Sequence, residues 1–332
     1  MDAEALARWY ANEARDLPWR RTSDPWSILL SEVLLQQTQV ARGIEYWRRI
    51  LDRFPTVASM AEADLDEVMH LWQGAGYYAR GRRLHALAVE VCGPDGPWNG
   101  ALPSPSTSVD VVADFQRLPG IGPYTAAAVA SIAHEVPAAV VDGNVRRVVA
   151  RQTATLQPTA GHVTSLAQAW MDVAHAQNVA PSVWNQAVME LGATVCTPRA
   201  PSCSNCPVQK GCLARDHPNG PSAFPAPAKR RVMTERLVAL VDVDAQGHPH
   251  LVQRSSEARF GGLWGPRYLD VNDAAVVDEC GRRTKAGDVV HLLSHRRLEV
   301  EVWVGQTEHG VDPASKAIST LDERVLELAI ST

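Results

Sequence analysis

The chain lacks the long apolar run that a membrane-spanning helix needs, which is about 18 residues. Its longest candidate, residues 126–141, is interrupted by His134, Glu135 and Pro137, so we predict no membrane-spanning helix. It also lacks a basic segment followed by an apolar stretch near Met1, which is the pattern of a secretory signal. We therefore expect a cytoplasmic, reducing environment.

An excess of positive charge is absent as well. Lysine and arginine together number 32, against 37 aspartate and glutamate residues, which gives a net charge of −5. A protein that coats nucleic acid by bulk attraction needs a strongly positive surface. The composition excludes that class of protein, but it does not exclude a local basic groove.

The length of 332 residues exceeds that of one ordinary domain. Apolar residues recur every three or four positions from Ala3 to about Leu213, which predicts helices. Four prolines in residues 216–227 indicate a linker. We predict a mostly helical domain over 1–215, a linker over 216–231 and a smaller α+β domain over 232–332.

Strand-like patterns appear only in this smaller C-terminal domain. Residues 236–243 and 248–253 are predicted to pair as strands around the turn 245–247. Residues 298–304 alternate apolar and polar side chains and predict a third strand. A helix near 319–330 is expected to close the chain.

Four of the six cysteines lie close together in the sequence, with the spacing C-x6-C-x2-C-x5-C. In a reducing environment such a group indicates metal ligands rather than disulfides. Pro198, Pro201 and Pro207 prevent a regular helix, so the loop can wrap one metal centre. Thiolate ligands alone leave zinc and a four-iron cluster both open. The four residues are Cys196, Cys203, Cys206 and Cys212.

A glycine-rich turn precedes a helix of small residues in the middle of the N-terminal domain. Gly120 and Gly122 lie in the run Leu118 to Pro123. Backbone N–H groups at a helix N-terminus can bind a phosphate oxygen, and an ordinary helix–turn–helix corner is the alternative. Asp142 follows in an apolar run, either as a functional carboxylate or as the cap of a helix over 144–151.

These motifs, in this order, resemble the helix–hairpin–helix DNA glycosylases that carry an iron–sulfur cluster. Further segments resemble the MutY-type adenine DNA glycosylases within that superfamily. They are LPWR at 17–20, SEVLLQQTQV at 31–40, LWQGAGYYARGRRLH at 71–85 and WNQAVMELGATVC at 184–196.

The resemblance implies a helical glycosylase core and a [4Fe-4S] cluster in the loop 196–212. It implies excision of adenine mispaired with 8-oxoguanine or guanine in double-stranded DNA, by base flipping and hydrolysis of the N-glycosidic bond. We expect a monomer that acts in base excision repair, nucleoid-associated if bacterial.

Two carboxylates are the expected catalytic pair. Glu32 has apolar neighbours, which would raise its pKa and keep it protonated. The resemblance assigns Glu32 to protonating the imidazole-ring nitrogen of adenine and assigns Asp142 to stabilising the sugar cation. Tyr124 and Asn144 match residues that support Asp142. Tyr124 also stands where endonuclease III-type enzymes carry a lysine, so efficient strand cleavage is not expected.

Other residues match DNA-binding positions of the family. Gln37 and Tyr77 match side chains that wedge into the gap left by the flipped base, and Leu35 and Thr38 flank this site. Arg20 and Gln186 match residues at the adenine pocket. The groups expected beside the DNA phosphates are Gly120, Gly122, Arg80, Arg82, Arg83, Arg146 and Arg147.

The C-terminal third resembles, over 251–265 and 293–305, a lesion-recognition domain related to the Nudix hydrolases. It carries no Nudix box, so pyrophosphate hydrolysis is not expected. Ser294 and His295 match a loop that distinguishes 8-oxoguanine from guanine. The family usually has Phe before this serine, where the chain has Leu293.

Other functions remain open on the sequence alone. A thymine or uracil mismatch glycosylase would share the fold, but Gln37, Tyr77 and the C-terminal domain disfavour it. A non-catalytic binder of damaged DNA is disfavoured by Glu32 and Asp142. A zinc-binding regulator is the third alternative.

Overall fold

The computed structural model describes residues 1–94, 98–227, 233–255, 258–293 and 296–331. By their internal contacts these residues form two compact units. Unit 1 comprises Met1–Glu62 with Ala86–Ala228, and unit 2 comprises Ala63–His85 with Lys229–Thr332. Among the described residues, no helix combines the length and the apolar character that crossing a membrane would require.

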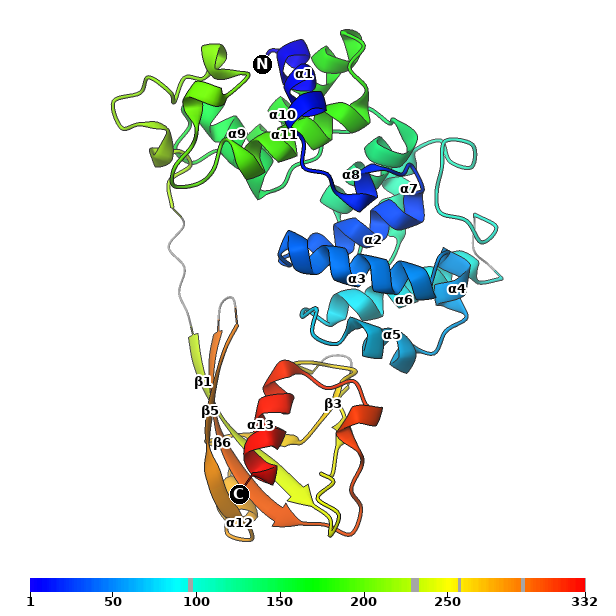
Figure 1. The fold of residues 1–332 in the computed structure, drawn as a ribbon, viewed down its shortest axis with the longest axis vertical. Coiled ribbons are helices and arrows are strands. Elements are labelled where there is room, and N and C mark those ends of the chain that lie inside the picture. Colours follow the sequence, from blue (N-terminus) through cyan, green and yellow to red (C-terminus); the bar gives the residue numbers. More distant parts are fainter. Residues whose placement is uncertain (95–97, 228–232, 256–257, 294–295, 332) are drawn as a thin grey trace. The chain divides into compact units, whose positions relative to one another are not determined.

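Unit 1 is built from helices, connected by loops of which the one between α6 and α7 and the one after α11 are long (Figure 1). Its complete helices are α1 (Ala3–Glu13), α2 (Pro25–Leu35), α3 (Val40–Arg53), α4 (Val57–Ala61), α7 (Val111–Arg117), α8 (Pro123–His134), α9 (Gly143–Gln152), α10 (Ala160–Ala176) and α11 (Pro181–Thr194). Helix α5 (Leu65–Trp72) belongs to unit 2, and α6 (Ala79–Cys92) contributes residues to both units.

Helix α2 forms the centre of the first unit. Asp24 caps its N-terminus by accepting a hydrogen bond from the Ser27 N–H at 2.8 Å, and Pro25 occupies the first turn. Nine consecutive residues from Trp26 to Leu34 are buried. Helix α8 packs against α2 and buries the small residues 126–130, which lets the two helices approach closely.

Residues 216–227, which the sequence predicts as part of a linker, pack on unit 1. Phe224 is 2% exposed and lies against Ala150 and Ala214. The Ala226 N–H donates to the Leu156 carbonyl at 2.8 Å. The proline content therefore produces an irregular segment here, but that segment has a buried anchor.

Unit 2 contains a mixed four-stranded sheet in the order β4-β1-β6-β5 (Figure 1). Strands β1 and β6 pair in parallel, whereas β4 and β5 pair antiparallel with their neighbours. Helix α13 covers one face through Leu321, Val325 and Leu326. The elements are β1 (Met233–Val243), β2 (Val252–Gln253), β3 (Trp264–Gly265), β4 (Arg267–Asp270), α12 (Val276–Cys280), β5 (Thr284–Leu292), β6 (Arg296–Gln306) and α13 (Thr320–Ile330).

The fold class expected from the sequence is confirmed, with helices in the N-terminal part and an α+β C-terminal part. The expected pairing of 236–243 with 248–253 is wrong beyond the turn. Asp244 and His250 donate backbone bonds across the turn, to His248 and Asp242. Pro249 then provides no N–H for the ladder, and β2 pairs with β3 instead.

Candidate active site and metal centre

A cavity of about 230 Å³ opens between the helices of unit 1. Helices α2, α8, α9 and α11 each contribute side chains to it. Further lining residues come from the segment before α2, from the start of α3 and from the residues that precede α3 and α9. Nearly all residues predicted for base excision meet here: Arg20, Glu32, Leu35, Thr38, Tyr124, Asp142, Asn144 and Gln186.

Glu32 extends into this cavity from the buried α2 helix. It is 6% exposed, and its Oε2 accepts a hydrogen bond from the Tyr124 hydroxyl at 2.6 Å. The pKa of Glu32 is raised to about 7. Burial is the main cause and the negative charge of Asp142 adds to it, whereas the hydrogen bond from Tyr124 acts in the opposite direction. Glu32 is therefore protonated in a substantial fraction of molecules at neutral pH.

Asp142 lies at the N-terminus of α9 and lines the same cavity. Its Oδ1 accepts from the Val145 N–H at 2.7 Å, and its Oδ2 accepts from the Asn144 side-chain amide at 2.8 Å. Asp142 is therefore the helix cap that the sequence allowed as an alternative, and it also faces the cavity.

Tyr124 connects α8 to this carboxyl pair. Besides bonding Glu32, its hydroxyl lies 3.8 Å from the Met189 sulfur on α11. Burial and the adjacent Glu32 raise the Tyr124 pKa well above its usual value, so the phenol stays neutral. A neutral phenol donates a hydrogen bond but does not act as the nucleophile that a lysine at this position would provide.

Glu190 is a charged residue of the cavity that the sequence interpretation did not select. Its side chain is fully buried, and its carboxylate accepts bonds of 2.7 Å from both Arg15 and Arg20. Burial alone would raise its pKa, but the hydrogen bonds from Arg15 and Arg20 lower it to about 2. A detectable signal was its place on α11, one helical turn after Gln186 in an apolar run.

Gln37 and Tyr77 share an unusual backbone conformation. Their φ angles are +63° and +49°, in the left-handed region that few residues other than glycine adopt. Both side chains are exposed, and Tyr77 is 41% accessible. They belong to different units. Strained, exposed polar and aromatic side chains of this kind are typical of functional positions.

The glycine turn lies between α7 and α8, as predicted. Gly120 has a φ of +78°, which a residue with a Cβ adopts only with strain, and Gly122 precedes the first turn of α8. Pro123 occupies the first helical position, where its missing N–H leaves no intrahelical bond unmade.

The arginines expected beside phosphates differ in their surroundings. Arg80 is 8% exposed and donates to the carbonyls of Ala75 and Gly76 at 3.3 and 2.9 Å. Arg83 is exposed. The other three donate to backbone carbonyls: Arg82 to Gly261, Arg146 to Pro158, and Arg147 to Cys196 and Gly192.

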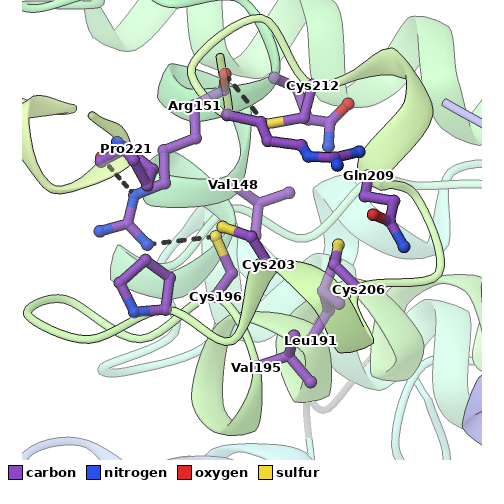
Figure 2. A pocket seen from close by; sticks show the side chains of 13 residues that line it. Val148, Arg151, Leu191, Val195, Cys196, Cys203, Cys206, Gln209, Cys212 and Pro221 are labelled. Carbon is purple, nitrogen blue, oxygen red and sulfur yellow. Dashed lines mark hydrogen bonds between the residues drawn. The ribbon is translucent and has the colours of Figure 1, made fainter. Parts of the chain in front are cut away.

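The four clustered cysteines line a second cavity of unit 1 (Figure 2). Only two short 3-10 turns, Cys203–Asn205 and Gln209–Gly211, interrupt the loop that carries them. Buried Arg151 donates to the Cys196 sulfur at 3.3 Å and to the Thr197 carbonyl at 2.7 Å. These bonds hold the loop beside α9.

The donor set of this loop, four cysteine thiols, has the chemistry that binds either an iron–sulfur cluster or a single zinc ion. In the described part of the chain, no three Cys, His, Asp or Glu side chains are already arranged around one ion. Burial raises the Cys206 pKa to about 11.

The structure describes only part of the segment predicted to recognise the lesion. Ser294 and His295 lie outside the described residues. Leu293 directly precedes them and packs partly against the core between the sheet and α13. Of the two remaining cysteines, Cys92 belongs to unit 1 and Cys280 to unit 2, and both are free thiols.

The helical unit, its glycine turn and its acidic cavity define a class of proteins, the helix–hairpin–helix base excision repair enzymes. Residues 30–172 match the family model described as HhH-GPD superfamily base excision DNA repair protein. Among solved structures, a thermostable thymine-DNA glycosylase is 25% identical with a TM-score of 0.53, over 64% of this chain and 93% of that one. A trapped endonuclease III–DNA covalent intermediate, 22% identical over 64% and 92% of the two chains with a TM-score of 0.50, shows the same fold.

Curated relatives narrow the class to one family. The adenine DNA glycosylase of Mus musculus is 36% identical over an alignment that covers 90% of this chain and 69% of the mouse protein. That of Mycolicibacterium smegmatis is 40% identical over 206 residues, 61% of this chain and 66% of the relative. The chain belongs to the adenine DNA glycosylase family of base excision repair, whose members are hydrolases acting on N-glycosyl bonds.

Proposed function

We propose that this chain excises adenine mispaired with 8-oxoguanine, and also with guanine, from double-stranded DNA. The observation that carries the proposal is the carboxyl pair of the larger cavity. Glu32 has a pKa of about 7, and it faces the same space as Asp142, whose carboxyl oxygens accept hydrogen bonds from Val145 and Asn144. A flipped adenosine nucleotide placed there meets an acid and an anion together.

The chemistry follows from these two groups. Glu32 gives its proton to the imidazole ring of adenine, so that the base leaves as a neutral molecule when the C1′–N9 bond breaks. The Asp142 carboxylate stabilises the positive charge that develops on the sugar. Water then adds to C1′ and returns a proton to Glu32, which leaves an abasic site.

The reaction stops at the abasic site. Strand cleavage by a glycosylase requires an amine that forms a Schiff base with the sugar. Where such an amine would stand, directly after the glycine turn, this chain has Tyr124, whose neutral hydroxyl is already bonded to Glu32. We therefore assign a monofunctional glycosylase.

Base release from a panel of duplexes tests the function. We expect adenine to be released from A:8-oxoguanine and A:G duplexes, with intact strands until alkali is added. Release of thymine or uracil from mispairs with guanine would assign a different substrate. Specific binding without any base release would identify a non-catalytic binder of damaged DNA.

The loop 196–212 is proposed to hold a [4Fe-4S] cluster on Cys196, Cys203, Cys206 and Cys212. A bound cluster would cross-link the loop beside α9, whose N-terminus carries Asp142. Anaerobically purified protein should contain about four iron atoms per chain and absorb broadly in the visible region. Stoichiometric zinc without iron would contradict this assignment.

Double-stranded DNA is the partner, bound by one copy of the chain. Gln37 and Tyr77 are proposed to enter the space left by the flipped adenine, because both are exposed and conformationally strained. Ser294 and His295 are proposed to contact the oxidised guanine. Analytical ultracentrifugation of the protein with a short lesion duplex should give a one-to-one complex.

A further inference from the structure

We infer that two side-chain amides, Gln168 and Asn185, form a brace that positions Asp142 for the glycosidic reaction. The inference rests on the proposed function for its catalytic consequence. Its structural basis is the segment 137–141, which leads from the end of α8 to Asp142 at the start of α9.

This segment belongs to neither a helix nor a sheet of the described structure. In a strand, the carbonyl of one residue and the N–H two positions later point to the same side. The hydrogen bonds of the segment follow this pattern: residues 137 and 139 bond one side chain, and residues 138 and 140 bond another. A neighbouring strand would normally bond each pair.

Gln168 of α10 takes the place of a strand on one side. Its Oε1 accepts from the Ala139 N–H at 2.9 Å, and its Nε2 donates to the Pro137 carbonyl at 2.9 Å. The second Nε2 hydrogen bond goes to Asp172, at 2.8 Å on the same helix, which fixes the orientation of the amide.

Asn185 of α11 takes the place of a strand on the other side. Its Oδ1 accepts from the Val140 N–H at 3.1 Å, and its Nδ2 donates to the Ala138 carbonyl at 2.8 Å. The same Nδ2 donates to the buried Ser131 hydroxyl of α8 at 2.8 Å. Asn185 is 3% exposed, so water does not compete for these bonds.

The brace ends two residues before Asp142. It connects α8, α10 and α11 to the segment, and the hydrogen bonds of Asp142 to Val145 and Asn144 fix the other end. The Asp142 carboxylate is therefore held from both directions along the chain. Gln168 and Asn185 do not line the cavity, so they are positioning residues and not catalytic ones.

Gln168→Met and Asn185→Leu test the brace, because both substitutions keep the approximate side-chain size and remove the hydrogen bonds. Gln177→Met is the matched control, since it makes the same chemical change at the exposed end of α10. We expect faster hydrogen exchange of the Ala139 and Val140 amides in both test variants and no change in the control. This readout does not depend on activity.

The catalytic consequence is measured under single turnover with an A:8-oxoguanine duplex. Displacing Asp142 by about 1 Å should lower the rate constant by on the order of 10²-fold, with little change in DNA affinity. The alkaline limb of the pH profile should also move to lower pH, because the Asp142 charge, with burial, raises the Glu32 pKa, and Tyr124 and Arg20 oppose it.

Faster exchange with an unchanged rate constant and pH profile would overturn the brace, since the cap of α9 alone would then position Asp142. A parallel loss of DNA affinity and rate without a shifted pH limb would also overturn it, as it indicates general loosening. Gln168→Met keeps the test informative if Asn185→Leu does not fold. Absence of adenine release by the unsubstituted protein would contradict the proposed function and leave the exchange result standing.

Discussion

Two carboxyl groups of one cavity have pKa values shifted in opposite directions because their neighbours differ. Glu32 lies on the buried helix α2 and accepts a hydrogen bond from the Tyr124 phenol, so burial dominates and raises its pKa to about 7. Glu190 is more deeply buried but accepts several N–H groups from Arg15 and Arg20, and its pKa falls to about 2. Burial alone therefore does not predict which of the two acts as an acid.

Glu32→Gln is expected to abolish adenine release and to stabilise the fold at alkaline pH. The folded pKa of about 7 lies above the ordinary glutamate value of 4.5, so stability associated with Glu32 is present below pH 4.5 and lost as pH rises to about 7. At pH 8 the free energy of unfolding of the variant should exceed that of the original protein by up to about 3 kcal/mol. Urea unfolding at pH 5 and pH 8 measures it, and equal differences at the two pH values would contradict the assignment.

Glu190→Gln is expected to destabilise the protein, because Arg15 and Arg20 lose their charged partner. We expect about 2 kcal/mol at pH 7, since Arg15 is 40% exposed and solvent screens its share. The low pKa of Glu190 gives stability that is present above pH 4.5 and lost as pH falls towards 2. The difference between variant and original should therefore shrink in acid, and a difference that grows in acid would refute this origin.

The contrast between these two residues shows what the sequence could predict. Glu32 has apolar neighbours along its own helix, so its burial is visible in the sequence. Glu190 also lies in an apolar run, but Arg15 and Arg20 come from the far end of the chain. Their convergence is a product of tertiary structure, which residue spacing does not encode.

Helices α9 and α11 approach each other most closely where Asn144 meets Gly192. A Cβ built on Gly192 would lie 2.5 Å from the Asn144 Cβ and 3.1 Å from its Cα. The absence of a side chain at Gly192 therefore allows the N-terminal turn of α9, with Asp142, to sit beside α11. The close approach of these two elements determines the shape of the catalytic cavity.

Gly192→Ala is expected to displace the start of α9 and to lower the single-turnover rate by about 100-fold. Gly161→Ala in α10 is the control, since a Cβ there meets nothing within 4 Å and alanine favours a helix by up to about 1 kcal/mol. An unchanged rate for Gly192→Ala would show that α9 and α11 can separate without moving Asp142.

Phe224→Ala is expected to destabilise unit 1 by about 3 to 5 kcal/mol, because it empties a buried site beside Ala150 and Ala214. Cleavage by a protease within 216–227 should become faster. Asn219→Ala, at an exposed position of the same segment, should change neither quantity. If the two variants behaved identically, Phe224 would not anchor the segment, and the segment would be the linker that its composition predicts.

Elements were predictable where the pattern is local. The helical period predicts α13, and the alternation over 298–304 predicts β6. The braced segment 137–141 and the pairing of β2 with β3 were not predictable, because their partners are side chains and strands distant in the sequence.

At the scale of the whole molecule, the residues proposed for excision and those proposed for lesion recognition belong to different compact units. The acidic cavity and the cysteine loop belong to unit 1, whereas Tyr77 and Leu293 belong to unit 2. Contacts also group the helical segment Ala63–His85 with the C-terminal domain, although its helical period resembles that of unit 1. A compact unit therefore combines two stretches that composition alone would assign to different domains.

Leu293→Phe is expected to increase the preference for A:8-oxoguanine over A:G, because an aromatic ring at this position matches the family pattern. We expect the ratio of single-turnover rates to rise about threefold to tenfold, the range of one added aromatic contact. Val277→Phe, at an exposed position of α12, serves as the control. An unchanged ratio would show that discrimination does not involve this position.

The parallel pairing of β1 and β6 has a consequence for how the chain is made. All eleven residues from Met233 to Val243 take their neighbours from Arg296–Gln306. On the ribosome, β1 emerges well before β6 and stays without its long neighbour until the residues of β6 have been synthesised. Nascent chains stalled before residue 306 should consequently bind chaperones through this apolar strand.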